Sequence, residues 1–171
     1  IYIDACIENS LYQKDKKGYE NFNIVFTSIH GTTYTTVPKA LKKAGFSSVN
    51  FVEEQMIPNG NFPSVDSPNP EEPKAFTLAI ELANKKNADM IIGTDPDGDR
   101  LGIAVRDLNG DIQLLNGNQT NTIFTYYILE QWQKLGKITG KEFKAQLQRS
   151  SMRSKTRLKI NTKKLLKQSR K

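Results

Sequence analysis

The chain has 171 residues, enough for one ordinary domain and too few for two well-buried ones. Hydrophobic residues make up 37% and charged residues 25%, and no apolar run approaches the roughly 18 residues that span a bilayer, which argues against a membrane protein. The single cysteine, Cys6, cannot form an internal disulfide, so we expect a reducing compartment, the cytoplasm.

The net charge of +7 comes entirely from the C-terminal end of the chain. Residues 144–171 contain eleven Lys or Arg and no Asp or Glu, so residues 1–143 carry a net charge of −4. Any argument for nucleic-acid binding therefore depends on this tail and not on the body of the protein.

The first half of the chain alternates between strand and helix patterns. Residues 1–20 predict a lead-in helix and a linker. A β-branched and aromatic run at 23–29 predicts a buried strand that stops at His30. Residues 33–44 have apolar side chains at helical spacing, with Pro38 near the helix start, where proline is tolerated.

The middle of the chain combines a second strand, a proline-rich loop and a second helix. Residues 48–53 alternate in polarity and predict a strand. The loop at 54–73 contains five prolines, a density that argues against regular structure (Pro58, Pro63, Pro68, Pro70 and Pro73). Residues 71–86 predict an amphipathic helix with one apolar face (Ala75, Leu78, Ala79, Leu82 and Ala83).

The last third predicts three strands and a helix. Residues 89–93 and 101–105 form short apolar runs, and an Asn-Gly pair at 109–110 predicts a hairpin leading to a strand at 112–115. Residues 118–135 predict a helix whose inward-facing side chains are Ile123, Tyr127, Ile128 and Leu135.

This element order predicts the α/β class, with a mainly parallel sheet covered on both faces by helices. The loop between the third and fourth strands is too short for a crossover, so we expect the fourth strand to run antiparallel to the third.

Three aspartates alternate directly after the third strand, in the sequence GTDPDGDR at 93–100. Pro96 and Gly98 separate Asp95, Asp97 and Asp99, and the glycine permits a positive φ, so the backbone can curl and turn alternate side chains toward one point. Three converging carboxylates repel one another unless a cation holds them, and oxygen ligands favour Mg²⁺, Mn²⁺ or Ca²⁺ over zinc.

Two other interpretations of these aspartates compete with a metal site of this kind. An EF-hand starting at Asp95 requires glycine at its sixth position and glutamate at its twelfth, which are Arg100 and Arg106 here, so it is excluded. A solvated acidic turn stays open, although the carboxyl end of a strand is where open α/β sheets bind ligands. Arg100 is suited to binding phosphate, or it is a charge partner for the aspartates.

Three segments, in order, resemble the α-D-phosphohexomutases, the phosphoglucomutase/phosphomannomutase family. GTDPDGDRLGIAV is similar to the metal loop of that family and the strand after it. IVFTSIHGT is similar to the opening strand and turn of the same domain, and FPSVDSPNPEE is similar to its proline-rich loop. The likeness covers about residues 1–142. By this resemblance, residues 1–20 are a linker from a missing first domain, 21–142 form domain II, and 143–171 are a basic tail that is non-native or disordered.

The resemblance implies a three-layer α/β/α domain with a mixed, mostly parallel four-stranded sheet. It implies Mg²⁺, with Mn²⁺ possible, held by Asp95, Asp97 and Asp99, with Asp99 and Arg100 near a phosphosugar. The metal's next ligand in that family is a phosphate on a catalytic serine of the first domain. Ser28 lacks that serine's sequence context, so we expect no catalytic residue here, weak metal binding and no turnover by this chain alone.

Several points stay open at this stage. His30 either approaches the active cleft or is a hydrogen-bonded turn histidine. The tail is an out-of-frame or cloning-derived extension, or a basic arm for nucleic acid or an anionic membrane. The alternative function is therefore a nucleic-acid-binding module, and a second enzymatic alternative is another Mg²⁺-dependent phosphotransferase on a Rossmann-like sheet. The hexose phosphate, glucose or mannose 1- or 6-phosphate, is undetermined, because sugar choice resides in other domains of the same chain.

Overall fold

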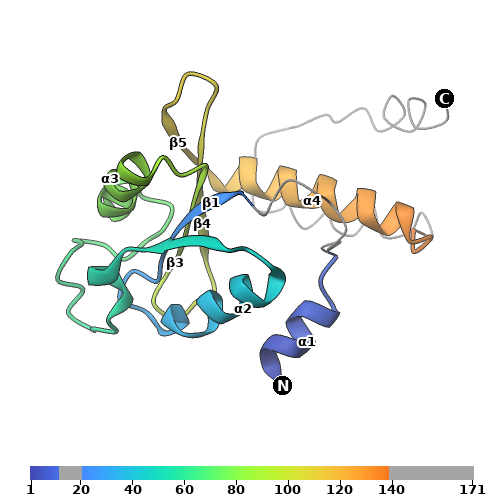
Figure 1. The fold of residues 1–171 in the computed structure, drawn as a ribbon, viewed down its shortest axis with the longest axis horizontal. Coiled ribbons are helices and arrows are strands. Elements are labelled where there is room, and N and C mark those ends of the chain that lie inside the picture. Colours follow the sequence, from blue (N-terminus) through green and yellow to red (C-terminus); the bar gives the residue numbers. More distant parts are fainter. Residues whose placement is uncertain (12–20, 139–171) are drawn as a thin grey trace. The chain divides into compact units, whose positions relative to one another are not determined.

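The computed structural model describes residues 1–11 and 21–138, which form an α/β fold around a five-stranded sheet (Figure 1). The chain divides into two compact units, residues 1–128 and 129–171, and the sheet belongs to the first. The predictions for the linker at 12–20 and for the basic tail at 143–171 lie outside the described residues. Within the described ranges, no helix has both the length and the hydropathy needed to cross a membrane.

The strands lie in the order β2-β1-β3-β4-β5. β1 pairs in parallel with β2 and β3, whereas β4 is antiparallel to both β3 and β5, so four of the five strands point the same way. The mixed, mostly parallel sheet and the reversed fourth strand are confirmed. The sheet has five strands, not four, because the hairpin strand also joins it. The bounds are β1 Asn23–Thr27, β2 Ser48–Phe51, β3 Met90–Thr94, β4 Leu101–Arg106 and β5 Ile112–Leu115.

The order of the first three strands reverses direction at β1. The chain leaves β1 through α2 (Thr36–Ala44) to reach β2 on one side, and returns through α3 (Thr77–Lys86) to β3 on the other side of β1. Right-handed crossovers in these two directions place α2 and α3 on opposite faces, as Figure 1 shows. The connections diverge between the carboxyl ends of β1 and β3, the switch point where α/β sheets bind ligands.

The helix after β1 follows its sequence signals. Pro38 lies in the first turn of α2, and the helix ends at Gly45, whose φ of 100° is the left-handed conformation that glycine adopts without strain. At its start, a short 3₁₀ turn, Thr32–Tyr34, precedes the helix and connects it to β1.

The helix before β3 begins later than its pattern predicts. Residues Pro73–Phe76 form a 3₁₀ turn, and α3 begins at Thr77. The predicted apolar face is otherwise covered: Ala75, Ala79 and Ala83 are fully buried, and Leu78 and Leu82 are partly buried against the same core. Phe76, in the 3₁₀ turn, is fully buried as well. Phe76 was absent from the predicted face, and its burial contributes about 2–3 kcal/mol.

The predicted inward face of the last helix is wrong. α4, Gly117–Lys134, forms as expected, but Ile123, Tyr127 and Leu135 are 53%, 37% and 50% exposed, and Ile128 is only partly buried. Of its residues 117–128, only Thr120 is buried. Helical spacing shows which side chains share a face, but it does not show whether another element covers that face.

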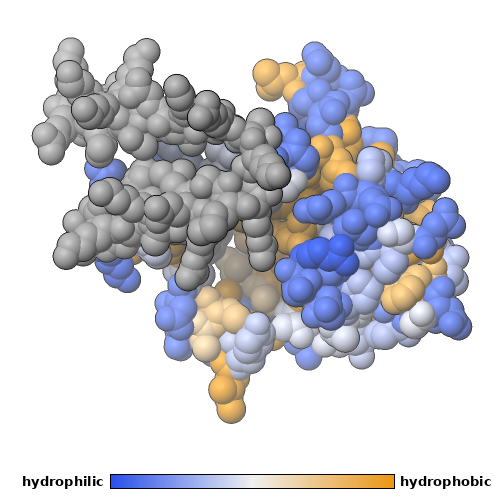
Figure 2. Space-filling view, turned by 180° about the vertical axis from the view of Figure 1, so that it is seen from behind, coloured by the Kyte–Doolittle hydropathy of each residue, from blue (hydrophilic) through white to orange (hydrophobic). Residues whose placement is uncertain are grey.

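The surface of the described residues is mixed in polarity. Figure 2 shows hydrophobic atoms in patches among mostly hydrophilic ones. The remaining short helix, α1, spans Tyr2–Glu8 and has no buried residue. The buried core instead lies on the sheet, where α3 contacts β1 and β3. It consists of Val25, Ile29, Val52, Ala75, Phe76, Ala79, Ala83, Ala88, Ile91 and Ala104.

Candidate metal centre

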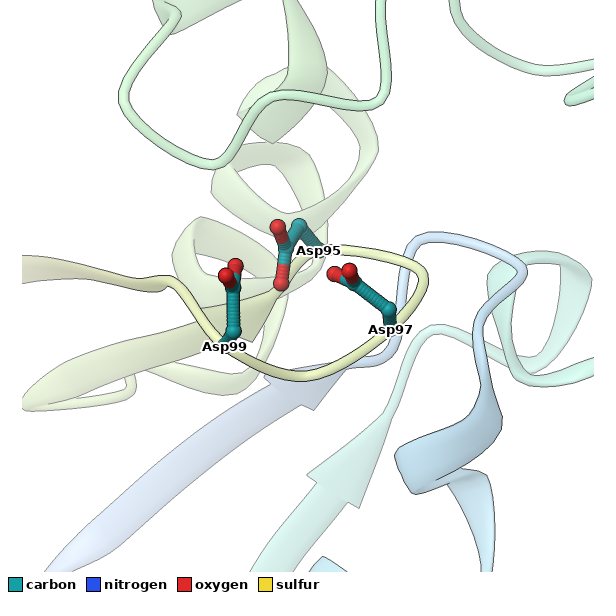
Figure 3. A group of neighbouring side chains, drawn as sticks. All are labelled: Asp95, Asp97 and Asp99. Carbon is teal, nitrogen blue, oxygen red and sulfur yellow. The ribbon is translucent and has the colours of Figure 1, made fainter.

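The aspartate loop, residues 95–100, connects β3 to β4 at the carboxyl end of β3. The parallel register pairs Thr27 of β1 with Gly93 of β3, so the loop lies beside the turn that follows β1. Each of the three aspartates offers a carboxylate oxygen, and these oxygens lie within 4.8 Å of one another. Figure 3 shows the side chains turned toward one another from successive points of the loop.

Asp95 is the anchor of the loop. Its side chain is buried, and its Oδ1 accepts hydrogen bonds from the backbone N–H groups of Gly98 and Arg100, at 3.1 and 3.0 Å. Gly98 has a φ of 78°, a conformation that side-chain-bearing residues rarely adopt. The glycine thus lets the backbone curl back so that a buried carboxylate closes the loop from inside.

The charges of the loop oppose one another. The charge of Asp97 is the main cause that raises the pKa of Asp99, with hydrogen bonding and charge from Asp95 adding to it. Burial acts to raise the pKa of Asp95, but hydrogen bonds from the backbone and side chain of Arg100, together with its charge, outweigh burial and lower it. The two exposed carboxylates therefore carry repulsion that a bound cation would relieve.

Arg100 forms the charge pair that the sequence left open. Its Nε donates to Asp95 Oδ2 at 2.6 Å and lies 3.9 Å from Asp99 Oδ1. The pKa of Arg100 is raised, first by the hydrogen bond to Asp95. The Arg100 side chain is 50% exposed and that of Asp99 76%, so both are accessible to a ligand, and their roles toward a phosphosugar stay a prediction.

The structure gives His30 and Ser28 local hydrogen-bonding roles. His30 is buried, with Nδ1 3.0 Å from the Ile57 carbonyl oxygen and Nε2 2.8 Å from Ser64 Oγ, which is the turn-histidine alternative. Ser28 is also buried and donates to the Gln55 carbonyl oxygen at 3.0 Å.

The sequence did not indicate that the turn after β1 contacts the aspartate loop. The backbone N–H of Thr32 and its Oγ1 both donate to the carbonyl oxygen of Pro96, at 2.8 and 3.0 Å. The only signal was indirect: both residues follow strands that the predicted topology places in one sheet. Neighbouring strand ends do not specify which polar groups meet.

Comparison with known proteins identifies the family of the chain. Residues 1–110 match the family model of the phosphoglucomutase/phosphomannomutase alpha/beta/alpha domain II. The chain belongs to this family. The resemblance drawn from the three sequence segments is therefore confirmed.

The curated relatives that the chain matches are longer than the chain. A phosphoglucomutase of Staphylococcus aureus strain MRSA252 is 50% identical over 115 residues, 67% of this chain and 21% of the relative. The phosphoglucomutase of strain N315 is 49% identical over 115 residues, with the same two coverages. The chain thus spans about a fifth of the length of the curated relatives it matches.

A solved structure shows the shared fold. The phosphoglucomutase/phosphomannomutase family protein from Burkholderia thailandensis matches with a TM-score of 0.59 at 22% identity. The match covers 75% of this chain and 26% of that one. At this identity the likeness establishes the fold alone.

Proposed function

We propose that this chain is the metal-binding domain of a phosphohexomutase, an isomerase that moves a phosphoryl group within a hexose phosphate. The observation that carries the proposal is the convergence of Asp95, Asp97 and Asp99 at the switch point of the sheet. The membership of the chain in the phosphoglucomutase/phosphomannomutase family supports the same function.

The donor set fits a hard divalent cation. Three carboxylates offer only oxygen ligands, which suit Mg²⁺ and also Mn²⁺, and octahedral Mg²⁺ leaves roughly three positions for water or phosphate. Neighbouring oxygens around such an ion lie about 3 Å apart, so oxygens that lie within 4.8 Å of one another would close by at most about 1.8 Å. When bound, the cation neutralises phosphoryl charge.

The residues of the loop have different roles, which follow from how exposed each side chain is. Asp95 is buried and holds the backbone of the loop, whereas Asp97 and Asp99 present their carboxylates to solvent. We assign Asp99 and Arg100 to the phosphosugar, because the guanidinium offers a planar pair of donors that matches phosphate. The phosphoryl donor is a phosphoserine in another domain of the full-length protein.

The substrate of that protein is a hexose phosphate, glucose or mannose 1- or 6-phosphate, and the compartment that we propose is the cytoplasm. The nucleic-acid alternative depends on residues 144–171, which lie outside the described residues, and none of the reported relatives supports it.

Metal binding is tested by titrating the full chain with Mn²⁺ and counting free ion by electron paramagnetic resonance, with and without inorganic phosphate. We expect one site, tightened by phosphate. Asp97→Asn should weaken it at least about tenfold, since even outer partners of metal ligands contribute about 10–100-fold. Asp66→Asn, an exposed aspartate outside the loop, is the control. If the wild-type chain binds no Mn²⁺ even with phosphate present, the proposal is wrong.

Catalysis is tested separately. The purified chain should not convert glucose 1-phosphate to glucose 6-phosphate in a coupled dehydrogenase assay, because we place the phosphoserine outside it. Measured turnover above a no-protein blank would contradict that assignment and leave the metal site to be judged by the Mn²⁺ titration.

A further inference from the structure

The turn after β1 has an unusual backbone. Ile29 and His30 have φ values of 44° and 60°, two successive non-glycine residues in the left-handed region. For the β-branched Ile29 this conformation is a genuine outlier, and such strain persists only where surrounding contacts impose it. Strained backbone of this kind concentrates at functional sites, so its contacts are informative.

A directional hydrogen-bond network imposes the strain from one side. The Ile29 N–H donates to Thr27 Oγ1 at 3.0 Å, and that hydroxyl donates to Gln55 Oε1 at 2.7 Å. Gln55 Nε2 donates to Ser64 Oγ at 3.1 Å, and Ser64 meets His30 Nε2 at 2.8 Å.

The ring of His30 has a partner at each nitrogen. A carbonyl oxygen only accepts, so His30 Nδ1 donates to Ile57, and Nε2 lies 2.8 Å from Ser64 Oγ. The His30 backbone is held as well, since its N–H donates to the Gln55 carbonyl and its own carbonyl accepts from the Asn59 N–H. The 55–64 segment thus binds both the backbone and the ring of His30.

The same turn also contacts the aspartate loop. Thr32 donates twice to the Pro96 carbonyl oxygen, at 2.8 Å from N and 3.0 Å from Oγ1. Gly31 is in tight contact with the same residue, because a Cβ atom added there would lie 2.4 Å from Pro96 Cα. Thr33 Oγ1 lies 2.5 Å from Thr94 Oγ1, on the residue that precedes Asp95.

We propose that the positioning turn, residues 29–33, sets the angle between the Asp95 and Asp97 carboxylates by holding the Pro96 carbonyl. The peptide group joining Pro96 to Asp97 is planar, so fixing its oxygen fixes the plane from which Asp97 departs. The N–H groups of Gly98 and Arg100 close the same loop on Asp95, so a loosened Pro96 carbonyl should loosen these hydrogen bonds too. This inference rests on the proposed function of the loop as a metal site.

The test uses paired substitutions in the full chain. Thr32→Val keeps the branched shape and the backbone N–H but removes the hydroxyl donor, and Thr32→Ser restores that donor. Thr35→Val is the matched control, because Thr35 is exposed and its hydroxyl does not cap α2. Gly31→Ala pushes on Pro96, and Gly60→Ala is its control, since a Cβ there has nothing within 4 Å.

The first measurement needs no metal. Amide hydrogen exchange at Gly98 and Arg100, whose N–H groups bond to Asp95, should quicken about three- to tenfold in Thr32→Val, the equivalent of one lost hydrogen bond. Gly31→Ala should quicken it more, and Thr32→Ser should restore the wild-type rate. Unchanged exchange in both Thr32→Val and Gly31→Ala overturns the inference, whether or not the loop binds metal.

The second measurement is the Mn²⁺ dissociation constant. We expect Thr32→Val to raise it about three- to tenfold and Thr32→Ser to stay within about twofold of wild type. If the wild-type chain binds Mn²⁺ and both Thr32→Val and Gly31→Ala bind it equally well, the positioning role is wrong and the metal site stands. A wild-type chain without Mn²⁺ affinity would instead overturn the proposed function.

Discussion

Two glycines lie opposite each other on the strands that lead into and out of the aspartate loop. Gly93 of β3 pairs with Gly102 of β4, and the buried ring of Phe76 covers both. A Cβ added at Gly93 would lie 2.7 Å from Phe76 Cζ, and one at Gly102 would lie 2.9 Å from the same atom. At Gly102 it would also lie 2.2 Å from the Pro70 carbonyl oxygen, which belongs to the backbone.

This difference predicts that shrinking Phe76 rescues one alanine substitution and not the other. Overpacking costs about 1–3 kcal/mol, and replacing glycine returns about 0.5–1 kcal/mol from the unfolded chain, so Gly93→Ala should lower the free energy of unfolding by about 1–2 kcal/mol. In the double variant with Phe76→Leu, the cost should fall below the sum of the single costs by about 1 kcal/mol. Gly102→Ala combined with Phe76→Leu should stay additive within about 0.5 kcal/mol, because the Pro70 carbonyl still blocks it.

The assay is urea unfolding of the metal-free chain, followed by far-ultraviolet circular dichroism. Gly60→Ala, where a Cβ meets nothing within 4 Å, serves as the neutral control within about 0.5 kcal/mol. Equal rescue of both alanine variants by Phe76→Leu would show that the Pro70 carbonyl does not limit the space at Gly102. A cost of Gly93→Ala equal to that of Gly60→Ala would refute the ring contact itself.

Two further predictions concern the carboxylates. Arg100→Gln removes the guanidinium that donates to Asp95, so the pKa of Asp95 should rise. Carbon-13 nuclear magnetic resonance across an acid titration measures this pKa. An unchanged pKa would mean that the ion pair does not form in solution. Hydrogen bonds from backbone N–H groups, first that of Asp111, lower the pKa of Asp107 in the β4–β5 turn. A carboxylate whose pKa is lowered in the folded state stabilises the fold at pH values above its unfolded-state pKa of about 4. This stabilisation is lost as the pH falls through the folded-state pKa. When the pH is lowered below about 4, the free energy of unfolding should therefore fall less in Asp107→Asn than in the wild-type chain. Urea unfolding at successive pH values measures this fall, and an equal fall in both would contradict the assignment.

The sequence was sufficient for the features that local chemistry controls. The hairpin around Gly110, with a φ of 93°, follows from an Asn-Gly pair, and the end of α2 follows from Gly45. The reversed β4 follows from a connection too short to cross the sheet. The curl of the aspartate loop also follows locally, because Gly98 adopts a positive φ of 78° within it.

Other features depend on residues far apart in the chain. The left-handed backbone at Ile29 contradicts the preference of a β-branched residue. The neighbouring His30 is held by Gln55, Ile57 and Ser64, which lie more than twenty residues away. The contact of Thr32 with Pro96 spans 64 residues. No periodic pattern encodes such pairs, because each exists only after the strands have assembled.

What the sequence alone determined was the order of the elements, the family and the loop that gathers three carboxylates, since propensity, turn chemistry and spacing act over a few residues. Tertiary structure decided which side chains are covered, as the exposed Ile123 and the buried Phe76 show, because coverage depends on what packs against a face. It also decided that Arg100 pairs with Asp95, since a buried carboxylate binds the nearest cationic donor whatever ligand that donor is suited to.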